Sequence, residues 1–106
     1  MATKTYLVVR ATVADPADRA PFDYWYATEH LPDALAAFGA ARAWRAWSRT
    51  DPATHCAFYE FASWADAELG TSGPAIAGLI AEFDRKWQHR IVRTRELLEV
   101  AGELAA

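Results

Sequence analysis

One short segment of this sequence combines residue types that can move a proton at neutral pH. Glu29 and His30 stand side by side just before Pro32. An imidazole has an ordinary pKa close to neutrality, so it can accept and release a proton in the physiological range. A carboxylate beside it can orient the ring or act as a second base. The pair is therefore our candidate catalytic group, with His30 as the acid or base and Glu29 as its partner.

The spacing of the preceding residues places this pair against an aromatic wall. With about 100° per residue from Phe22, the side chains of Trp25 and Tyr26 fall on one apolar stripe of a helix. The same projection puts Glu29 in the middle of that stripe and His30 at its edge. Burial disfavours the charged forms of such groups unless they are partnered. We therefore expect the pair to face a pocket.

A structural role accounts for the same residues and stays open. Polar side chains at a broken helix end are often local hydrogen-bonding groups, and a histidine there can satisfy free carbonyl groups. Glu29 can instead pair with a strand arginine, namely Arg42, Arg45 or Arg93. The residue types alone do not decide between a structural and a chemical role.

Aromatic residues elsewhere are candidates for lining the pocket. Five Trp, four Tyr and five Phe in 106 residues are a heavy load for a small interior, so some should line a cavity or cover an interface. Trp44 and Trp47 are three apart in an expected strand and point to opposite faces, and which of them faces the pocket stays open. Core packing competes with ligand contact for all of these rings. The predicted substrate-binding residues are Phe22, Trp25, Tyr26, Trp44, Phe58, Tyr59, Phe83 and Trp87.

The sequence predicts neither a metal site nor a cofactor. The candidate ligands are scattered, with no pair at ligand spacing, although a haem held by one histidine stays open; these ligands are His30, His55, Cys56 and His89. The chain has no glycine-rich phosphate loop and no nucleophile elbow. The strand position of Cys56 indicates an inert thiol.

Composition and charge narrow the class of protein. The formal net charge is −3, and the 11 basic and 14 acidic residues are mixed, so no basic stripe for nucleic acid is present. No apolar run is long enough to span a membrane, and no leader resembles a signal peptide. A lone cysteine fits a reducing compartment, so we expect a cytoplasmic protein. The length predicts one domain over residues 1–106.

The elements that position these residues alternate between strands and helices. Pro32 should end or kink the first helix, and Gly39 should stop the short helical piece that follows. For the first helix, Asp18 is the expected N-cap, with Pro21 in the first turn. The expected strands cover residues 5–13, 41–49, 55–62 and 90–98, the helices begin at Asp18, Asp33, Ser63 and Pro74, and the residues after 98 are ambiguous.

This β-α-β-β-α-β order predicts an α+β, ferredoxin-like sandwich with a four-stranded antiparallel sheet and helices on one face. The first and third strands carry apolar residues on both sides, whereas helices can cover only one. We therefore expect a homodimer through the open sheet face, with tolerated exposed aromatics as the alternative. Charged residues within strands should pair across the sheet or interface, with a substrate carboxylate as the second option for Arg10 or Arg93; these residues are Arg10, Glu60, Arg93 and Glu96.

The segment from Phe22 to Pro32, FDYWYATEHLP, resembles the F-x-x-W-Y-x-x-E-H-x-P segment of EthD-like proteins in the dimeric α/β-barrel superfamily. The run EFDRKW at 82–87 is similar to their second helix. The resemblance implies a dimer whose sheets form a barrel, an apolar cavity in each subunit, and the family histidine at His30. Relatives include cofactor-independent monooxygenases, lactone isomerases, polyketide cyclases and haem-degrading enzymes, so the resemblance selects no reaction.

Two functions follow, and both stay open. The first is a cofactor-independent enzyme of isomerase, cyclase or monooxygenase type that acts on a small hydrophobic or aromatic molecule, with His30 as acid or base. The second is a non-catalytic dimeric module that binds a hydrophobic metabolite or serves as a stress-related structural protein. The sequence defines neither the substrate nor any dependence on haem or flavin.

Overall fold

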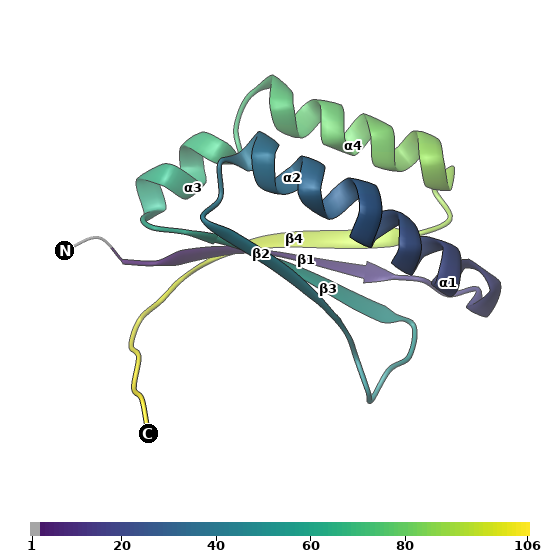
Figure 1. The fold of residues 1–106 in the computed structure, drawn as a ribbon, viewed down its shortest axis with the longest axis horizontal. Helices are drawn as coiled ribbons and strands as arrows, with labels where there is room; N and C mark the ends of the chain where they lie inside the picture. The colour runs from purple at the N-terminus through teal and green to yellow at the C-terminus, as the bar shows by residue number, and fades with distance from the viewer. Residues whose placement is uncertain (1–2) are drawn as a thin grey trace.

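The computed structural model describes residues 3–106, which form a four-stranded antiparallel sheet covered on one face by helices (Figure 1). The strands lie in the order β2-β3-β1-β4. The strands are β1 (Thr5–Thr12), β2 (Arg42–Trp47), β3 (Thr54–Phe61) and β4 (Val92–Glu99), and the helical segments are α1 (Pro16–Trp25), η1 (Tyr26–His30), α2 (Leu31–Phe38), α3 (Trp64–Gly70) and α4 (Pro74–Trp87). The predicted ferredoxin-like α+β fold is confirmed.

The first helical arm begins earlier than the sequence analysis predicts. Asp15 is the N-cap, because its side chain accepts a hydrogen bond from the Ala17 amide at 3.0 Å. Pro16 occupies the first turn, where a missing amide hydrogen does little harm, and Pro21 lies inside the helix. The predicted start at Asp18 is therefore wrong. The residues just before Asp18 already include a capping carboxylate, Asp15, followed by Pro16.

Three other predicted helix ends are confirmed, whereas the predicted helix start at Asp33 is wrong, because α1, η1 and α2 follow one another from Pro16 to Phe38 with no end at Pro32. Gly39 ends α2 with a φ of 63°, a left-handed conformation that glycine adopts without the steric cost of a Cβ atom. The Ser63 side chain caps α3 by accepting from the Asp66 amide at 3.1 Å. Pro74 opens α4. Residues 100–106, which were ambiguous from the sequence, have no regular structure.

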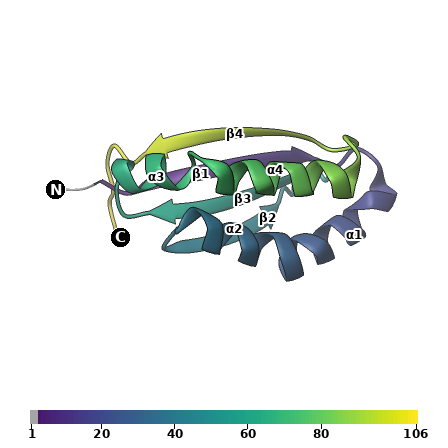
Figure 2. The same ribbon diagram turned by 90° about the horizontal axis from the view of Figure 1, so that it is seen from above.

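Helices and sheet enclose the core between them (Figure 2). Along β1 the helix-facing side chains are Leu7, Val9 and Ala11, and all three are buried. Register pairs them with Tyr59, Ala57 and His55 of β3. Trp47 shares this face and packs edge-on against Phe22 of α1, with ring centroids 6.0 Å apart. Of the two β2 tryptophans, Trp47 is therefore the one that faces the helices.

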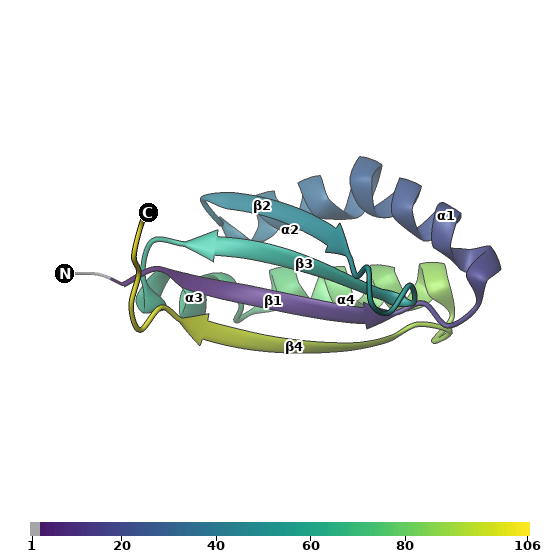
Figure 3. The same ribbon diagram turned by 90° about the horizontal axis from the view of Figure 1, so that it is seen from below.

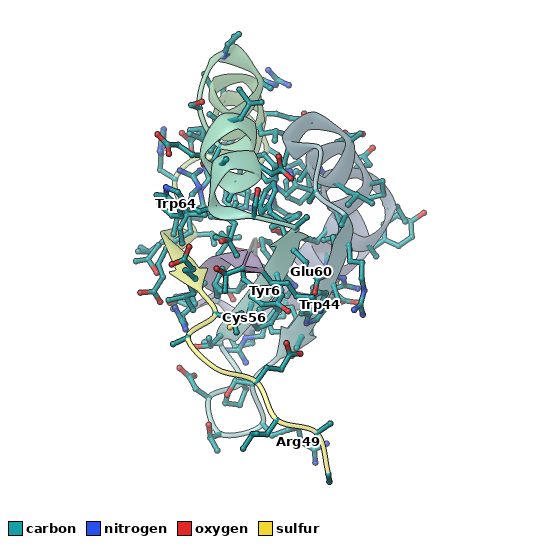
Figure 4. All side chains as sticks on the ribbon, turned by 90° about the vertical axis from the view of Figure 1, so that its left-hand side faces the viewer. Tyr6, Trp44, Arg49, Cys56, Glu60 and Trp64 are labelled. Carbon is teal, nitrogen blue, oxygen red and sulfur yellow. The ribbon has the colours of Figure 1, made fainter. Side chains whose placement is uncertain are left out.

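The opposite face of the sheet carries no helix (Figure 3). An apolar patch lies at its centre, where Trp44 stacks on Phe58 at 5.4 Å and meets Tyr6 edge-on at 5.9 Å. We call this the open-face patch; it comprises Tyr6, Val8, Trp44, Phe58 and Leu98. Figure 4 shows Tyr6 and Trp44 on the sheet, beside Glu60 and away from Trp64.

Charged residues surround the open-face patch and include three of the four strand residues expected to pair, whereas the fourth, Arg93, pairs with Asp84 of α4 on the other face. Arg10 donates to Glu96 at 2.9 Å across β1 and β4. Glu60 is buried and accepts a hydrogen bond from the Tyr6 hydroxyl at 2.8 Å, with Arg42 at 3.9 Å. None of the helices described in residues 3–106 is long and apolar enough to cross a membrane.

A close approach between α3 and α2 makes Gly70 a test of the packing. A Cβ at this position would collide with the carbonyl oxygen of Phe38 and lie 3.0 Å from the Phe61 ring. We expect Gly70→Ala to lower the free energy of unfolding by about 1–3 kcal/mol, because the backbone must move. Gly78→Ala is the matched control: with open space around it in α4, it should raise stability by about 0.5–1 kcal/mol. Urea unfolding at equal protein concentration measures both, and equal stability of Gly70→Ala and wild type would contradict this packing.

Candidate functional site

A π-helical turn, η1, directs His30 toward the sheet. The helix approaches Pro32, which has no amide hydrogen and whose ring crowds the preceding turn. The Leu31 amide donates to the Tyr26 carbonyl five residues earlier, which is the π-helical pattern. A turn with more residues advances each side chain through a smaller angle. His30 therefore falls inward beside Tyr26, and the chain continues into α2 without a break.

The same turn leaves Glu29 outside. Its side chain is exposed and borders a depression on the outer surface together with Lys86 of α4. The predicted position of Glu29 in the apolar stripe is wrong, because about 100° per residue holds for an α-helix and not across a π turn. Each strand arginine considered as its partner contacts a different carboxylate: Arg42 faces Glu60, Arg45 pairs with Asp23, and Arg93 pairs with Asp84. Glu29 therefore neither lies in the apolar stripe nor pairs with one of these strand arginines.

Aromatic rings enclose the His30 side chain, which is 7% exposed. Its ring stacks on Trp25 of α1, with centroids 4.7 Å apart and an interplanar angle of 21°. Tyr26 and Phe83 present their rings at steep angles, with centroids at 4.8 and 5.6 Å. The Nδ1 atom is buried and has no hydrogen-bond partner among residues 3–106. His30 is therefore a buried imidazole with unused hydrogen-bonding capacity rather than a helix cap.

Burial first, and then the positive charges of Arg93 and Arg95, together lower the pKa of His30 to about 4. The imidazole is consequently neutral at physiological pH. A neutral imidazole has one nitrogen with a free lone pair, so it can accept a proton as a base.

A small cavity lies beside His30 between the helices and the sheet. Its volume is about 20 Å³, which is room for about one water molecule. Its lining residues come from three strands and three helical segments: Val9, Tyr26, His30, Phe38, Tyr59, Ile76, Leu79, Phe83, Arg93 and Arg95. A wider depression of about 270 Å³ lies next to it and shares Ile76 and Arg95 as borders. Ile76 and Arg95 therefore lie between the cavity and the depression.

Two phenols stand at the base of the cavity. The Tyr26 and Tyr59 hydroxyl oxygens are 3.2 Å apart. Burial raises the pKa of both groups, so both are neutral at physiological pH. Neutral phenols at a dry site can donate hydrogen bonds to an oxygen that becomes negative. Tyr26 also touches the His30 ring, so a donor and a base adjoin the same space.

The structure brings together only some of the predicted substrate-binding residues. Tyr26, Tyr59 and Phe83 line the cavity with His30. Phe22, Trp25 and Trp87 are buried in the core around it and lie outside its lining. Trp44 and Phe58 are on the opposite face of the sheet, so their predicted place in the pocket is wrong. Strand register explains this outcome, because Phe58 precedes the inward-facing Tyr59 and neighbouring strand residues point to opposite faces.

Two polar residues on the helix-facing side were not predicted as site residues. Arg95 is two residues from Arg93 in β4, and this period-two spacing is the pattern that could have revealed it. His55 is fully buried in β3, where its ring lies 4.6 Å from that of Tyr26. Burial also lowers the pKa of His55 to about 4. In residues 3–106, no cluster of three or more His, Cys, Asp or Glu side chains is placed to hold a metal ion.

Comparisons with known proteins show the fold of this chain but do not show its activity. Neither family models nor curated proteins match the chain. A mutant of SnoaB, described as a cofactor-independent oxygenase from Streptomyces nogalater, superposes with a TM-score of 0.72 at 14% identity over 99% of this chain and 100% of that chain. A putative antibiotic biosynthesis monooxygenase from Nitrosomonas europaea gives a TM-score of 0.66 at 12% identity, covering 95% of this chain and 93% of that chain.

A third structure is more similar in sequence. It is a protein of unknown function from Nitrosomonas europaea, with a TM-score of 0.63 and 27% identity over 98% of this chain and 96% of that chain. These structures share the ferredoxin-like α+β fold of this chain. These matches do not single out the EthD-like proteins among the ferredoxin-like dimeric α/β barrels.

Because His30 and His55 are both buried, we expect the protein to lose stability in mild acid. Both have a folded-state pKa of about 4, below the ordinary value of 6.5. The unfolded chain therefore takes up protons first as the pH falls from 6.5 towards 4, and stability decreases over that window. Each histidine should contribute up to about 3 kcal/mol to this loss. We expect His55→Phe to flatten the pH dependence of urea unfolding between pH 7 and 4.5, whereas His89→Gln, at an exposed position, should retain the wild-type slope.

Proposed function

We propose that the chain binds a small aromatic molecule and that His30 acts on it as a general base. The observation that carries this proposal is the buried, neutral imidazole whose Nδ1 has no partner and whose ring borders a cavity. An unpaired buried polar group costs about 1–3 kcal/mol. A group that is costly to the fold and adjoins a cavity is a candidate for function.

The surrounding groups fit the removal of a proton from a phenol or from a carbon next to a carbonyl. His30 accepts the proton, and the Tyr26 and Tyr59 hydroxyls donate hydrogen bonds to the oxygen that becomes negative. Aromatic side chains keep water away from the charge that develops. The resulting anion can isomerise, cyclise or react with oxygen. The fold neighbour described as a cofactor-independent oxygenase supports this class of chemistry.

The sequence of the first helix refines the family assignment. The F-x-x-W-Y-x-x-E-H-x-P segment supports placing the chain among the EthD-like proteins, with His30 as the family histidine. The size of the cavity supports one alternative, a structural module without catalysis, because a volume of about 20 Å³ admits no ring unless the lining side chains move. Turnover by wild type and its loss on substitution of His30 distinguish the two functions.

We further propose that the chain is a homodimer in which a second copy covers the open-face patch. Trp44 and Leu98 are 36% and 43% exposed there, and Phe58 lies between Trp44 and Val8 in the register of the sheet. Exposed apolar patches of this kind mark interaction surfaces. The ion pair between Arg10 and Glu96 borders the patch and offers the polar rim that an interface needs.

His30→Gln tests the catalytic role, because glutamine keeps a neutral polar side chain without a basic nitrogen. With naphthols and cyclic aryl ketones as substrates, we expect at least about a 100-fold fall in turnover, with little change in Kd. Deuterium exchange at the acidic carbon, followed by NMR, and oxygen uptake provide the two readouts. His89→Gln, at an exposed position, is the matched control and should behave as wild type. Equal turnover by His30→Gln and wild type would exclude the proposed base.

Trp44→Glu tests the dimer. A carboxylate at the centre of the open-face patch would be buried without a partner, so we expect the variant to be a monomer. Trp64→Glu is the matched control, since Trp64 is 44% exposed and lies in α3 on the helical side. Sedimentation velocity at micromolar concentration should show wild type and Trp64→Glu at twice the chain mass. A monomeric wild type would refute the proposed dimer.

A further inference from the structure

Two arginines reach from the edge strand into the space beside His30. Arg93 and Arg95 are two residues apart in β4, so both point to the helix-facing side of the sheet. Their neighbours on β1 are Ala11 and Val9, whose short side chains leave room for the long arginine stems. Both arginines line the cavity, and Arg95 also borders the outer depression.

The positive charge at this place is only partly balanced. The Arg93 side chain is 12% exposed; it lies 3.7 Å from the centre of the Phe83 ring and makes an ion pair with Asp84 at 3.5 Å. Arg95 has no ion pair with any of residues 3–106. Two arginines thus line the cavity with one paired carboxylate, Asp84, while Glu96 at the border of the outer depression pairs with Arg10. A cavity that carries such an excess is complementary to a negatively charged ligand.

We propose that the aromatic ligand carries a carboxylate, which Arg93 and Arg95 bind at the cavity mouth. This inference rests on the function proposed for His30 and names the class of molecule that its site takes. Guanidinium groups hold carboxylates through paired hydrogen bonds in one plane. Arg10 is not part of this site, because it lies on the open face and pairs with Glu96.

The available space fits a ligand that is anchored by its charge at the entrance. The outer depression has a volume of about 270 Å³, close to the lower end of about 300–1,000 Å³ that is usual for ligand pockets. Ile76 and Arg95 separate it from the cavity beside His30. With its anionic group on the arginines, the ligand places its ring in the outer depression, and the ring reaches the imidazole once the Ile76 side chain moves aside.

Anion binding also has a consequence for the base. The charges of Arg93 and Arg95 are among the causes that lower the pKa of His30. A bound anion offsets these charges and therefore raises this pKa toward neutrality. A base is most effective when its pKa is close to the working pH. A ligand that binds the arginines therefore also makes His30 a more effective base.

The test compares two ligands of one shape, 1-hydroxy-2-naphthoate and 1-hydroxy-2-naphthamide, by calorimetric titration of the full chain at pH 7.5. We expect wild type to bind the acid at least about tenfold more tightly than the amide, as charge-assisted hydrogen bonds predict. Arg95→Gln, at an exposed position, should abolish most of this preference, and Arg93→Gln should do the same. Arg49→Gln is the matched control, because it removes the same charge from an exposed position in the β2–β3 connection, away from the helices (Figure 4).

Each outcome separates this inference from the proposed function. Equal binding of acid and amide by wild type would overturn the role of the arginines and leave the pocket intact, whereas binding of neither would overturn both proposals. An equal loss of preference in Arg49→Gln would show attraction by net charge alone and would also refute the site. As a second readout, NMR titration should show a higher pKa of His30 with the acid bound and no change with the amide. In Arg95→Gln without ligand, the pKa of His30 should already be higher than in wild type. This measurement tests the role of the arginines even if Arg93→Gln fails to fold.

Discussion

The helix that carries His30 cannot keep its regular hydrogen-bond pattern as it approaches Pro32. Proline has no amide hydrogen and crowds the turn before it, and the backbone responds by forming the longer bond from Leu31 to Tyr26. This one change of pitch decides which side chain faces the sheet. It buries His30, exposes Glu29 and still lets α2 continue over the same face. The position of the candidate base therefore depends on a backbone constraint set by a neighbouring residue.

Side chains from three separate elements complete the site around that turn. Phe83 of α4 contacts the His30 ring on one side and the Arg93 guanidinium on the other. The face of the aromatic ring attracts the cation, so Phe83 helps to hold Arg93 close to a histidine that its charge disfavours in the protonated form. The Tyr26 and Tyr59 hydroxyls form a hydrogen bond with each other. Base, cation and hydrogen-bond donors thus meet where η1, α4, β3 and β4 enclose one cavity.

Much of the fold could be predicted from the sequence, because it is encoded locally. The β-branched runs, the glycine stop at Gly39 and the serine cap at Ser63 each specify their element through nearby residues. The site was less predictable. The π turn leaves no periodic pattern in the sequence from which it could be predicted. A helical projection at about 100° per residue therefore placed Glu29 on the wrong side of the helix. The face that Trp44 occupies depends on register across strands, and the size of the cavity depends on how side chains from distant segments pack.

The edge strand links the two proposals about this molecule. β4 pairs only with β1, and its residues alternate between the cavity and the open face. Arg95 points to the cavity, whereas its neighbour Glu96 points to the open face and pairs with Arg10 of β1. A partner seated on the open face would shield this ion pair from water and so strengthen it. Because that pair ties β4 to β1, dimerisation would also fix the strand from which the arginines reach toward His30.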